Sequence, residues 1–126
     1  MGTDLTAAEK TEKEIVESIL IHSAESSNNH KAANKHFWKY TKLICRALQE
    51  DTGLLYKFIA HEEPAVRCTG AYYLLQTDKK AAEKTLKSLY KIQKDSIGFN
   101  AKMIMREWKS KRLKFPALKE GKILYK

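Results

Sequence analysis

The sequence predicts an all-α protein: a short α-α superhelix of about six helices in three stacked pairs, followed by a basic, non-helical C-terminal tail. Apolar residues recur at three-to-four spacing through most of the 126-residue chain. A shift of 33 residues aligns residues 66–75 with residues 99–108, and two-helix repeats have periods in the low thirties or above. We therefore expect a single helical domain over residues 1–118 and a basic tail over residues 119–126.

The first two helices are predicted from a cap and from apolar spacing. Thr6 to Glu9 fits a capping box, and the apolar positions that follow extend to about Ile21. Small polar residues predict a connection over residues 23–29. A second helix is expected from about residue 29 to residue 49, where His36 is interpreted as a hydrogen-bonded core histidine. Its apolar stripe is the strongest periodic signal in the chain: Ala33, His36, Phe37, Tyr40, Leu43, Ile44, Ala47 and Leu48.

The middle of the chain predicts a short helix and then the most buried one. The short helix covers residue 54 to about residue 60. Pro64 favours a helix start, because the first N–H groups of a helix have no intrahelical partner. The helix that begins there runs to about Gln76 and is apolar on nearly every side. Within it, Gly70 is best explained by close packing against another helix.

Two more helices carry most of the lysines. Asp78 can cap the fifth helix, whose lysine-rich face we expect to be solvated, and Ser96 can cap the sixth. In the sixth helix Phe99, Met103 and Trp108 are expected to pack inward. Another face of that helix carries three cations at i, i+4 and i+7: Lys102, Arg106 and Lys109.

The tail has no helical period. It either folds back as a short hairpin or forms a mobile basic arm. Docking is favoured for residues 113–118, because Leu113 and Phe115 would otherwise be exposed apolar groups.

Composition bounds the class of protein. Hydrophobic residues make up 43% of the chain and charged residues 31%, which is typical of a globular protein and not of a disordered one. No apolar run approaches the roughly 20 residues of a membrane span, and the N-terminus lacks a secretory signal, so we expect a cytoplasmic protein without a membrane partner. Cys45 and Cys68 are too few for a disulfide scaffold and are expected to be reduced core residues.

The formal net charge of +9 is unevenly spread. Residues 1–27 hold six acids and two bases, a net charge of −4, so the remaining residues carry +13. The sequence thus describes an acidic first helix on a basic body. Such asymmetry can steer a charged partner.

Several stretches resemble a known repeat type. These are the run from Pro64 to Arg67, the pair Leu74 and Leu75, and residues 99–103 continuing through 107–109 to 113–116. Together they resemble HEAT-type repeats, and more narrowly a bacterial group of short HEAT-like proteins known as domain of unknown function 2019. The resemblance covers residues 54–118. It implies a HEAT/armadillo-like superhelix. Because some relatives resemble neutralising partners of bacterial toxins, it also implies an immunity role, and it identifies no catalytic residue.

The leading hypothesis is a non-enzymatic protein-interaction module, in its specific form an immunity protein that neutralises a toxin. Arg67 has two interpretations, partner binding or pairing with an acid such as Asp51, Glu62 or Asp95. The body fits an acidic partner, whereas a basic partner would need the acids of the first helix, Glu9, Glu12 and Glu17. The candidate partner-binding residues are Lys102, Arg106, Lys109, Arg112 and Arg67.

The alternative hypothesis is a sequence-tolerant nucleic-acid binder. Phosphates would be followed by the tail lysines and by the cations in and after the sixth helix, namely Lys102, Arg106, Lys109 and Arg112. Trp108, Tyr125 or Phe115 would be available to stack on bases.

The sequence offers little support for catalysis or for metal or cofactor binding. The glycines are isolated and form no phosphate loop, Cys45 lies in an apolar helical pattern, and the histidines lack metal-ligand spacing. We expect no enzymatic activity, no metal and no cofactor. The oligomeric state does not follow from the sequence.

Overall fold

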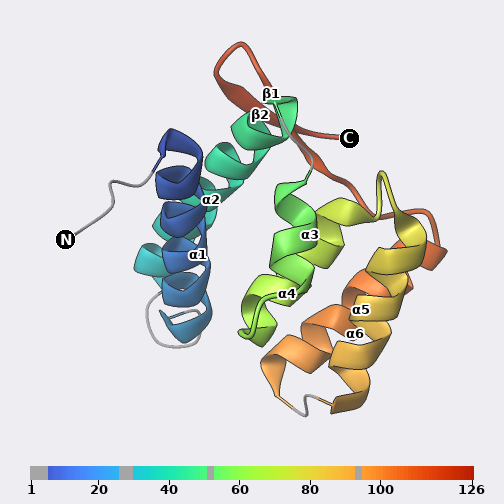
Figure 1. Ribbon diagram of the computed structural model, residues 1–126. Coiled ribbons are helices and arrows are strands. Elements are labelled where there is room, and N and C mark those ends of the chain that lie inside the picture. The colour runs from blue at the N-terminus through green and yellow to red at the C-terminus, as the bar shows by residue number, and fades with distance from the viewer. Residues whose placement is uncertain (1–5, 26–29, 51–52, 93–94) are drawn as a thin grey trace. The chain divides into compact units, whose positions relative to one another are not determined.

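The computed structural model describes residues 6–25, 30–50, 53–92 and 95–126, and these are mostly helical (Figure 1). The elements are α1 (Ala7–Glu25), α2 (His30–Glu50), α3 (Leu54–Ile59), α4 (Pro64–Leu74), α5 (Lys79–Ile92), α6 (Ser96–Lys109), β1 (Pro116–Lys119) and β2 (Lys122–Tyr125). The all-α prediction is therefore confirmed. The stacking of three pairs into a superhelix stays a prediction.

The chain divides into two compact units. Unit 1 contains residues 1–54 and 118–123, and unit 2 contains residues 55–117 and 124–126. The predicted division into residues 1–118 and a tail over 119–126 stays a prediction.

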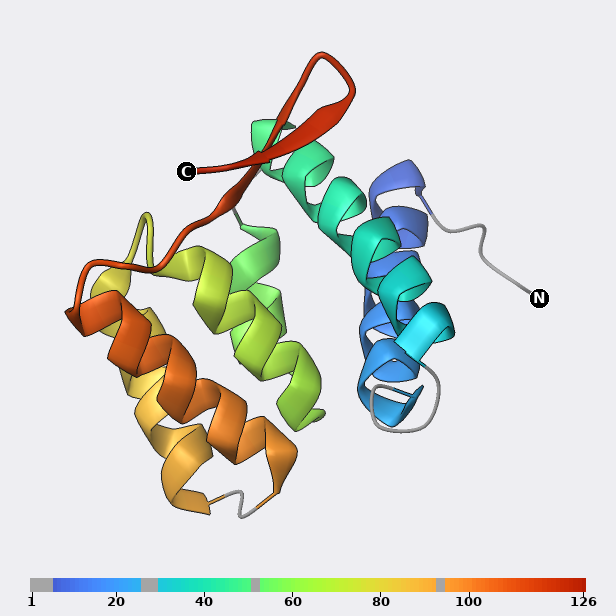
Figure 2. The same ribbon diagram turned by 180° about the vertical axis from the view of Figure 1, so that it is seen from behind.

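Unit 1 is built on the packing of α1 against α2, which lie side by side in Figures 1 and 2. Ile15 and Ile19 of α1 and Ile44 of α2 are almost fully buried. The predicted capping box is present, because the Glu9 N–H donates to Thr6 Oγ1 at 3.1 Å and the Thr6 N–H donates to Glu9 Oε1 at 3.4 Å. Helix α1 continues to Glu25, one turn beyond its predicted end, although this turn adds only the exposed Ala24 as an apolar residue.

Helices α1 and α2 also carry buried polar groups. Ser18 and Thr41 are buried, and neither Thr41 Oγ1 nor His36 Nδ1 has a hydrogen-bond partner among the described residues. The expectation of a hydrogen-bonded His36 is thus wrong at Nδ1. The ring centroid of His22 lies 5.7 Å from that of Phe37 and 5.7 Å from that of Tyr40. Burial, with a smaller contribution from His36, lowers the pKa of His22 below its usual value.

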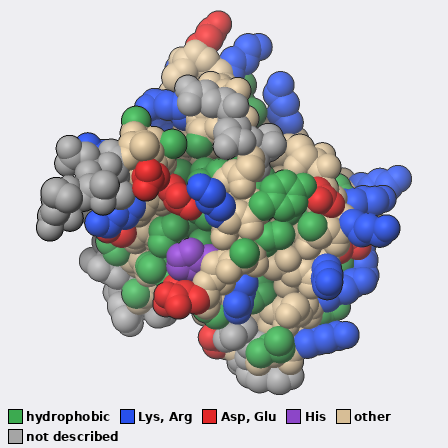
Figure 3. Space-filling model, viewed as in Figure 1, with side chains coloured by type: hydrophobic (Ala, Val, Ile, Leu, Met, Phe, Trp, Pro, Cys, Tyr) green, Lys and Arg blue, Asp and Glu red, His purple; other side chains and the backbone are tan. Residues whose placement is uncertain are grey.

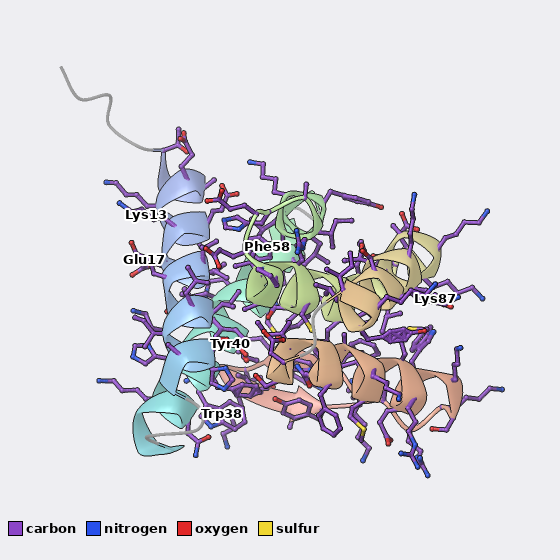
Figure 4. All side chains as sticks on the ribbon, turned by 90° about the horizontal axis from the view of Figure 1, so that it is seen from below. Lys13, Glu17, Trp38, Tyr40, Phe58 and Lys87 are labelled. Carbon is purple, nitrogen blue, oxygen red and sulfur yellow. The ribbon has the colours of Figure 1, made fainter. Side chains whose placement is uncertain are left out.

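In unit 2, α3 and α4 approach closely at Gly70. A Cβ atom on Gly70 would lie 2.5 Å from the Cβ of Phe58 and 3.3 Å from the backbone nitrogen of Ile59. Phe58 is 1% exposed and lies among the helices in Figure 4. The predicted reason for this glycine is therefore confirmed.

Helix α4 is the buried helix of unit 2, as predicted, and α5 and α6 both pack against it. Most of its residues are buried: Ala65, Val66, Cys68, Gly70, Ala71, Tyr73 and Leu74. The hydroxyl of Tyr56 in α3 donates to Asp78 Oδ2 at 2.7 Å, and Asp78 Oδ1 accepts from the Ala81 N–H at 3.2 Å. Asp78 therefore caps α5, as predicted, and also anchors α3 to that cap.

The cap and the buried face of α6 differ from prediction. Asp95, and not Ser96, is the N-cap, since its carboxylate accepts from the N–H groups of Ile97 and Gly98. The buried positions of α6 are Gly98, Ala101 and Met105, and Phe99 is 67% exposed. The inward position expected for Phe99 is therefore wrong. Gly98 and Ala101 on the buried side of α6 are small, so the backbones of packed helices can approach closely there. Because small residues are only weakly hydrophobic, the apolar pattern of the sequence does not mark this side as buried.

The 33-residue shift does not preserve burial. It aligns Val66, which is fully buried, with the exposed Phe99. Helices α4 and α6 each pack against α5 and against each other, but α4 is mostly buried and α6 keeps one solvent-facing side. Equivalent sequence positions therefore lie in different environments.

The segment after α6 docks on α4. Phe115 is 7% exposed, its ring stacks on Tyr72 at a centroid distance of 5.0 Å, and the Tyr72 hydroxyl donates to the carbonyl of Lys114. The docking predicted for this segment is confirmed at Phe115. Phe115 also exchanges two backbone hydrogen bonds with Lys126, 2.9 and 3.0 Å long.

The tail is a hairpin, which was one of the two predicted alternatives. Strands β1 and β2 pair, and Glu120 and Gly121 join them with φ angles of 52° and 78°. Positive φ at both central residues is the signature of the type I′ turn, whose twist matches that of two-residue hairpins.

Candidate binding face of α6

The exposed side of α6 forms a continuous stripe. Lys102, Arg106 and Lys109 are all exposed, as the sequence predicts. Phe99 belongs to the same stripe, because the four residues follow i, i+3, i+7 and i+10. We call these four residues the α6 face. No other described residue forms a hydrogen bond or an ion pair with its three cationic side chains.

Two large apolar side chains are exposed at one end of the α5–α6 pair. Ile92 is the last residue of α5 and is 69% exposed, and Phe99 lies in the first turns of α6. Helices α5 and α6 pack side by side and are connected at this end, as Figures 1 and 2 show. Both side chains are more exposed than any other large hydrophobic residue in the described part of the chain. They give the α6 face an apolar end.

The whole net charge of the chain lies in unit 2. The residues of unit 2 include fifteen bases and six acids, a formal charge of +9, and the residues of unit 1 include nine of each. The outward side of α5 adds a second row of exposed cations: Lys80, Lys84, Lys87 and Lys91. Lysine and arginine side chains gather on this side of the molecule in Figure 3, and Lys87 extends away from α5 in Figure 4.

The structure separates Arg112 and Arg67 from the α6 face. Arg112 lies beyond the end of α6, and its guanidinium donates to both carboxylate oxygens of Glu107, at 3.1 and 3.4 Å. Arg67 lies on α4, half-buried, and its Nη1 donates to the carbonyl of His61 at 3.4 Å. Among the described residues, neither Glu62 nor Asp95 pairs with Arg67, and the third predicted acid, Asp51, lies outside the described residues.

The alternative acidic face on α1 is interrupted. The carboxylate of Glu9 belongs to the capping box, where Oε1 accepts from the Thr6 hydroxyl at 3.0 Å. Glu12 is half-buried, and Glu17 is exposed. Lys13 projects from α1 near Glu17 in Figure 4, so a cation lies among these acids.

A surface hollow lies at the other end of α6. It encloses about 460 Å³ and is lined by Trp108, Lys109, Lys111 and Leu113. The inward packing predicted for Trp108 is only partial, because its side chain is half-buried. Its Nε1–H donates to Glu83 Oε2 at 3.4 Å.

The chain was compared with protein-family models, curated proteins and solved structures. None of them matches. The resemblance to HEAT-like proteins therefore stays a prediction.

The thiols are poorly suited to nucleophilic chemistry. Cys45 and Cys68 are both buried and carry no disulfide. Burial raises the pKa of Cys45, and it raises the pKa of Cys68 to about 12 despite a weak contact from the Asn100 amide at 3.8 Å. In the described ranges, no three His, Cys, Asp or Glu side chains are grouped so that they could hold a metal ion. No described helix combines the length and apolarity that crossing a bilayer requires.

Sequence reasoning missed Phe99 and Ile92 as surface residues and Lys111 as a lining residue. The spacing of Phe99 with Lys102 and Arg106 could have shown that all three share one face. No signal in the sequence marks Lys111, because its left-handed φ angle is known only from the structure. No residue pattern in the sequence signals the hollow.

Proposed function

We propose that this protein is a protein-interaction module that binds a partner with an acidic surface through the α6 face. The observation that carries the proposal is the exposed Phe99 in line with three cations that pair with no other described residue. Aromatic residues and arginine are both enriched at protein interfaces, and the α6 face contains one of each. The charge of +9 in unit 2 favours an acidic partner and speeds its association.

The apolar end of the face favours a protein over a nucleic acid. Ile92 and Phe99 add exposed aliphatic and aromatic surface at the same end of the α5–α6 pair, which suits a partner with an apolar pocket and an acidic rim. A phosphate backbone would use the cations but leave Ile92 without a counterpart.

The specific form of this proposal is an immunity role. The resemblance to the domain of unknown function 2019 group makes a bacterial toxin the first class of partner to test. An acidic contact surface on that toxin is what the α6 face requires.

The experiment is capture of partners by the tagged protein from its source lysate, after nuclease treatment, with three variants. Phe99→Ala removes the apolar anchor and is expected to raise the Kd for the captured partner about thirtyfold, equivalent to about 2 kcal/mol. Lys102→Glu with Arg106→Glu is expected to abolish it. Lys84→Glu with Lys87→Glu is the matched control, because it changes the charge equally on the outward side of α5 and is expected to retain the partner.

Three results would contradict the proposal. Loss of the partner in the control as well as in the Lys102/Arg106 variant would show general charge attraction. Retention of the partner by Phe99→Ala at unchanged affinity would show that Phe99 is not an anchor of the interface. Recovery of nucleic acid alone, abolished by nuclease, would favour the alternative hypothesis. The immunity role is tested separately: the captured protein should be toxic when expressed alone, and co-expression with this chain should restore growth.

A further inference from the structure

The hollow at the C-terminal end of α6 is lined by two apolar side chains and two cations. Trp108 and Leu113 are half-buried and supply the apolar surface, and the exposed Lys109 and Lys111 supply the charge. Its volume of about 460 Å³ lies within the range of about 300–1,000 Å³ that is typical of small-molecule sites. The hollow therefore has the size and the chemistry to hold a small anionic ligand with a flat face.

The indole of Trp108 is held in position before any ligand arrives. Its Nε1–H donates to Glu83 Oε2 at 3.4 Å, and its ring lies nearly perpendicular to that of Phe115 at a centroid distance of 6.2 Å. Phe115 is itself fixed by stacking on Tyr72. A ring fixed in this way loses little conformational entropy when another ring stacks on it.

Lys111 lies next to this ring in a strained backbone conformation. Its φ angle is 60°, which is the left-handed region. The Arg112 N–H donates to the Glu107 carbonyl at 2.9 Å, and the Lys111 N–H donates to the Trp108 carbonyl at 3.1 Å. These two bonds form a Schellman motif, in which the left-handed residue is usually glycine. A lysine there costs backbone energy, so its side chain points to a role at the site.

We propose that the hollow binds a nucleoside phosphate, with the base against the indole of Trp108 and the phosphate between the ammonium groups of Lys109 and Lys111. Aromatic stacking accepts any base, and two lysines match the charge of a phosphate monoester. The same chemistry occurs in a free nucleotide and at the phosphorylated end of a nucleic-acid strand. This site shares Lys109 with the α6 face but makes no use of its apolar anchor, because Lys111 lies about 18 Å along the helix axis from Phe99.

The test uses the indole N–H signals of the full-length protein in a two-dimensional NMR spectrum. The chain has two tryptophans, so Trp38→Phe assigns both signals, and the half-exposed Trp38 of the unmodified chain is an internal control. The probes are AMP, adenosine, inorganic phosphate and a 5′-phosphorylated oligonucleotide, each at about 1 mM. We expect AMP, the phosphorylated strand or both to shift the Trp108 signal and leave the Trp38 signal in place.

Lys111→Gly is the decisive variant, because it removes the ammonium group and also relaxes the left-handed backbone, so that folding is preserved. We expect it to weaken binding about tenfold or more, the usual effect of losing a hydrogen bond to a charged group. Lys87→Ala is the matched control with the same loss of charge, and it should bind like the unmodified chain.

A shift with AMP identifies a free nucleotide as a sufficient ligand, and a shift with the phosphorylated strand alone identifies a strand end. The proposal is overturned if neither probe moves the Trp108 signal, if Trp38 responds equally, or if Lys87→Ala weakens binding as much as Lys111→Gly. Equal affinity for adenosine and AMP would show that the phosphate makes no contact with the lysines. A shift of equal size with inorganic phosphate would show that the base makes no contact with Trp108.

Discussion

At the scale of single residues, Gly70 shows how one side chain decides the packing of two helices. Its Cα lies so close to α3 that a Cβ atom would overlap the Cβ of the buried Phe58. Both atoms belong to rigid parts of the chain, so neither can move aside without a backbone shift. The approach of α3 to α4 therefore requires glycine.

We predict that Gly70→Ala destabilises the protein. The overlap must be relieved by moving α3 or α4, and overpacking of this kind costs about 1–3 kcal/mol. The gain in helix propensity from glycine to alanine is smaller, at most about 1 kcal/mol. Urea unfolding of the variant should show a lower midpoint with an unchanged slope. A variant as stable as the parent would show that α3 moves freely. Gly98→Ala is not a suitable control because Gly98 is also buried.

At Gly70 the residue type suits the local structure, whereas at Lys111 it does not suit the backbone conformation. Glycine fits its left-handed conformation better, and the chain has lysine there. A position of this kind is found in the structure and not in the sequence, because composition says nothing about φ.

At the scale of elements, the helices that sequence reasoning predicted best are those with an apolar face and a recognisable cap. The capping box of α1, the proline that starts α4 and the aspartate that caps α5 all appear where the residue types indicate. The predictions for α6 failed in two respects, its cap and its buried face. Asp95 and Ser96 are adjacent and both are good caps, so the choice between them depends on the path of the preceding chain.

The candidate site was predictable only in part for the same reason. Three cations at i, i+4 and i+7 share a face in any helix, so their grouping follows from the sequence. Phe99 shares that face by the same spacing, but whether the face is exposed depends on which side of α6 meets its neighbours. The buried side consists of Gly98, Ala101 and Met105, a stripe that hydrophobicity alone does not distinguish.

The α1–α2 pair carries a prediction about pH. Burial lowers the pKa of His22 in the folded protein below 6.5, its value in the unfolded chain. The unfolded chain therefore binds more protons as the pH falls below about 6.5, and the free energy of unfolding decreases until the folded His22 also protonates. We expect denaturant midpoints at pH 5 to be lower than those at pH 7.5.

The control is His22→Gln, which keeps the size and polarity of the side chain and removes its titration. This variant should show a smaller decrease between the same two pH values. An unchanged decrease would show that the pH dependence does not come from His22.

At the scale of the whole molecule, the main feature is the division of charge. Unit 2 carries the entire excess of +9, and unit 1 is formally neutral. An excess of one sign within a compact unit destabilises it through self-repulsion. Salt should therefore act on one unit and not on the other.

We predict that raising the ionic strength from about 0.01 M to about 0.15 M stabilises unit 2 and leaves unit 1 nearly unchanged. The screening length falls from about 30 Å to about 8 Å, and the expected gain is of order 1 kcal/mol or less. Each unit contains one tryptophan, Trp38 in unit 1 and Trp108 in unit 2. Thermal unfolding followed by the fluorescence of Trp108 in Trp38→Phe, and of Trp38 in Trp108→Phe, separates the two responses. Equal responses would show that charge does not act unit by unit.

The two buried cysteines have a practical consequence. Cys45 belongs to unit 1 and Cys68 to unit 2, and both thiols are shielded from solvent. A shielded thiol reacts with a labelling reagent only during the moments when its surroundings open, so the rate of modification measures how often that part of the chain unfolds. The unmodified protein thus has one cysteine in each unit that reports how often that unit opens. Mass spectrometry of the two cysteine peptides can measure both modification rates in one experiment.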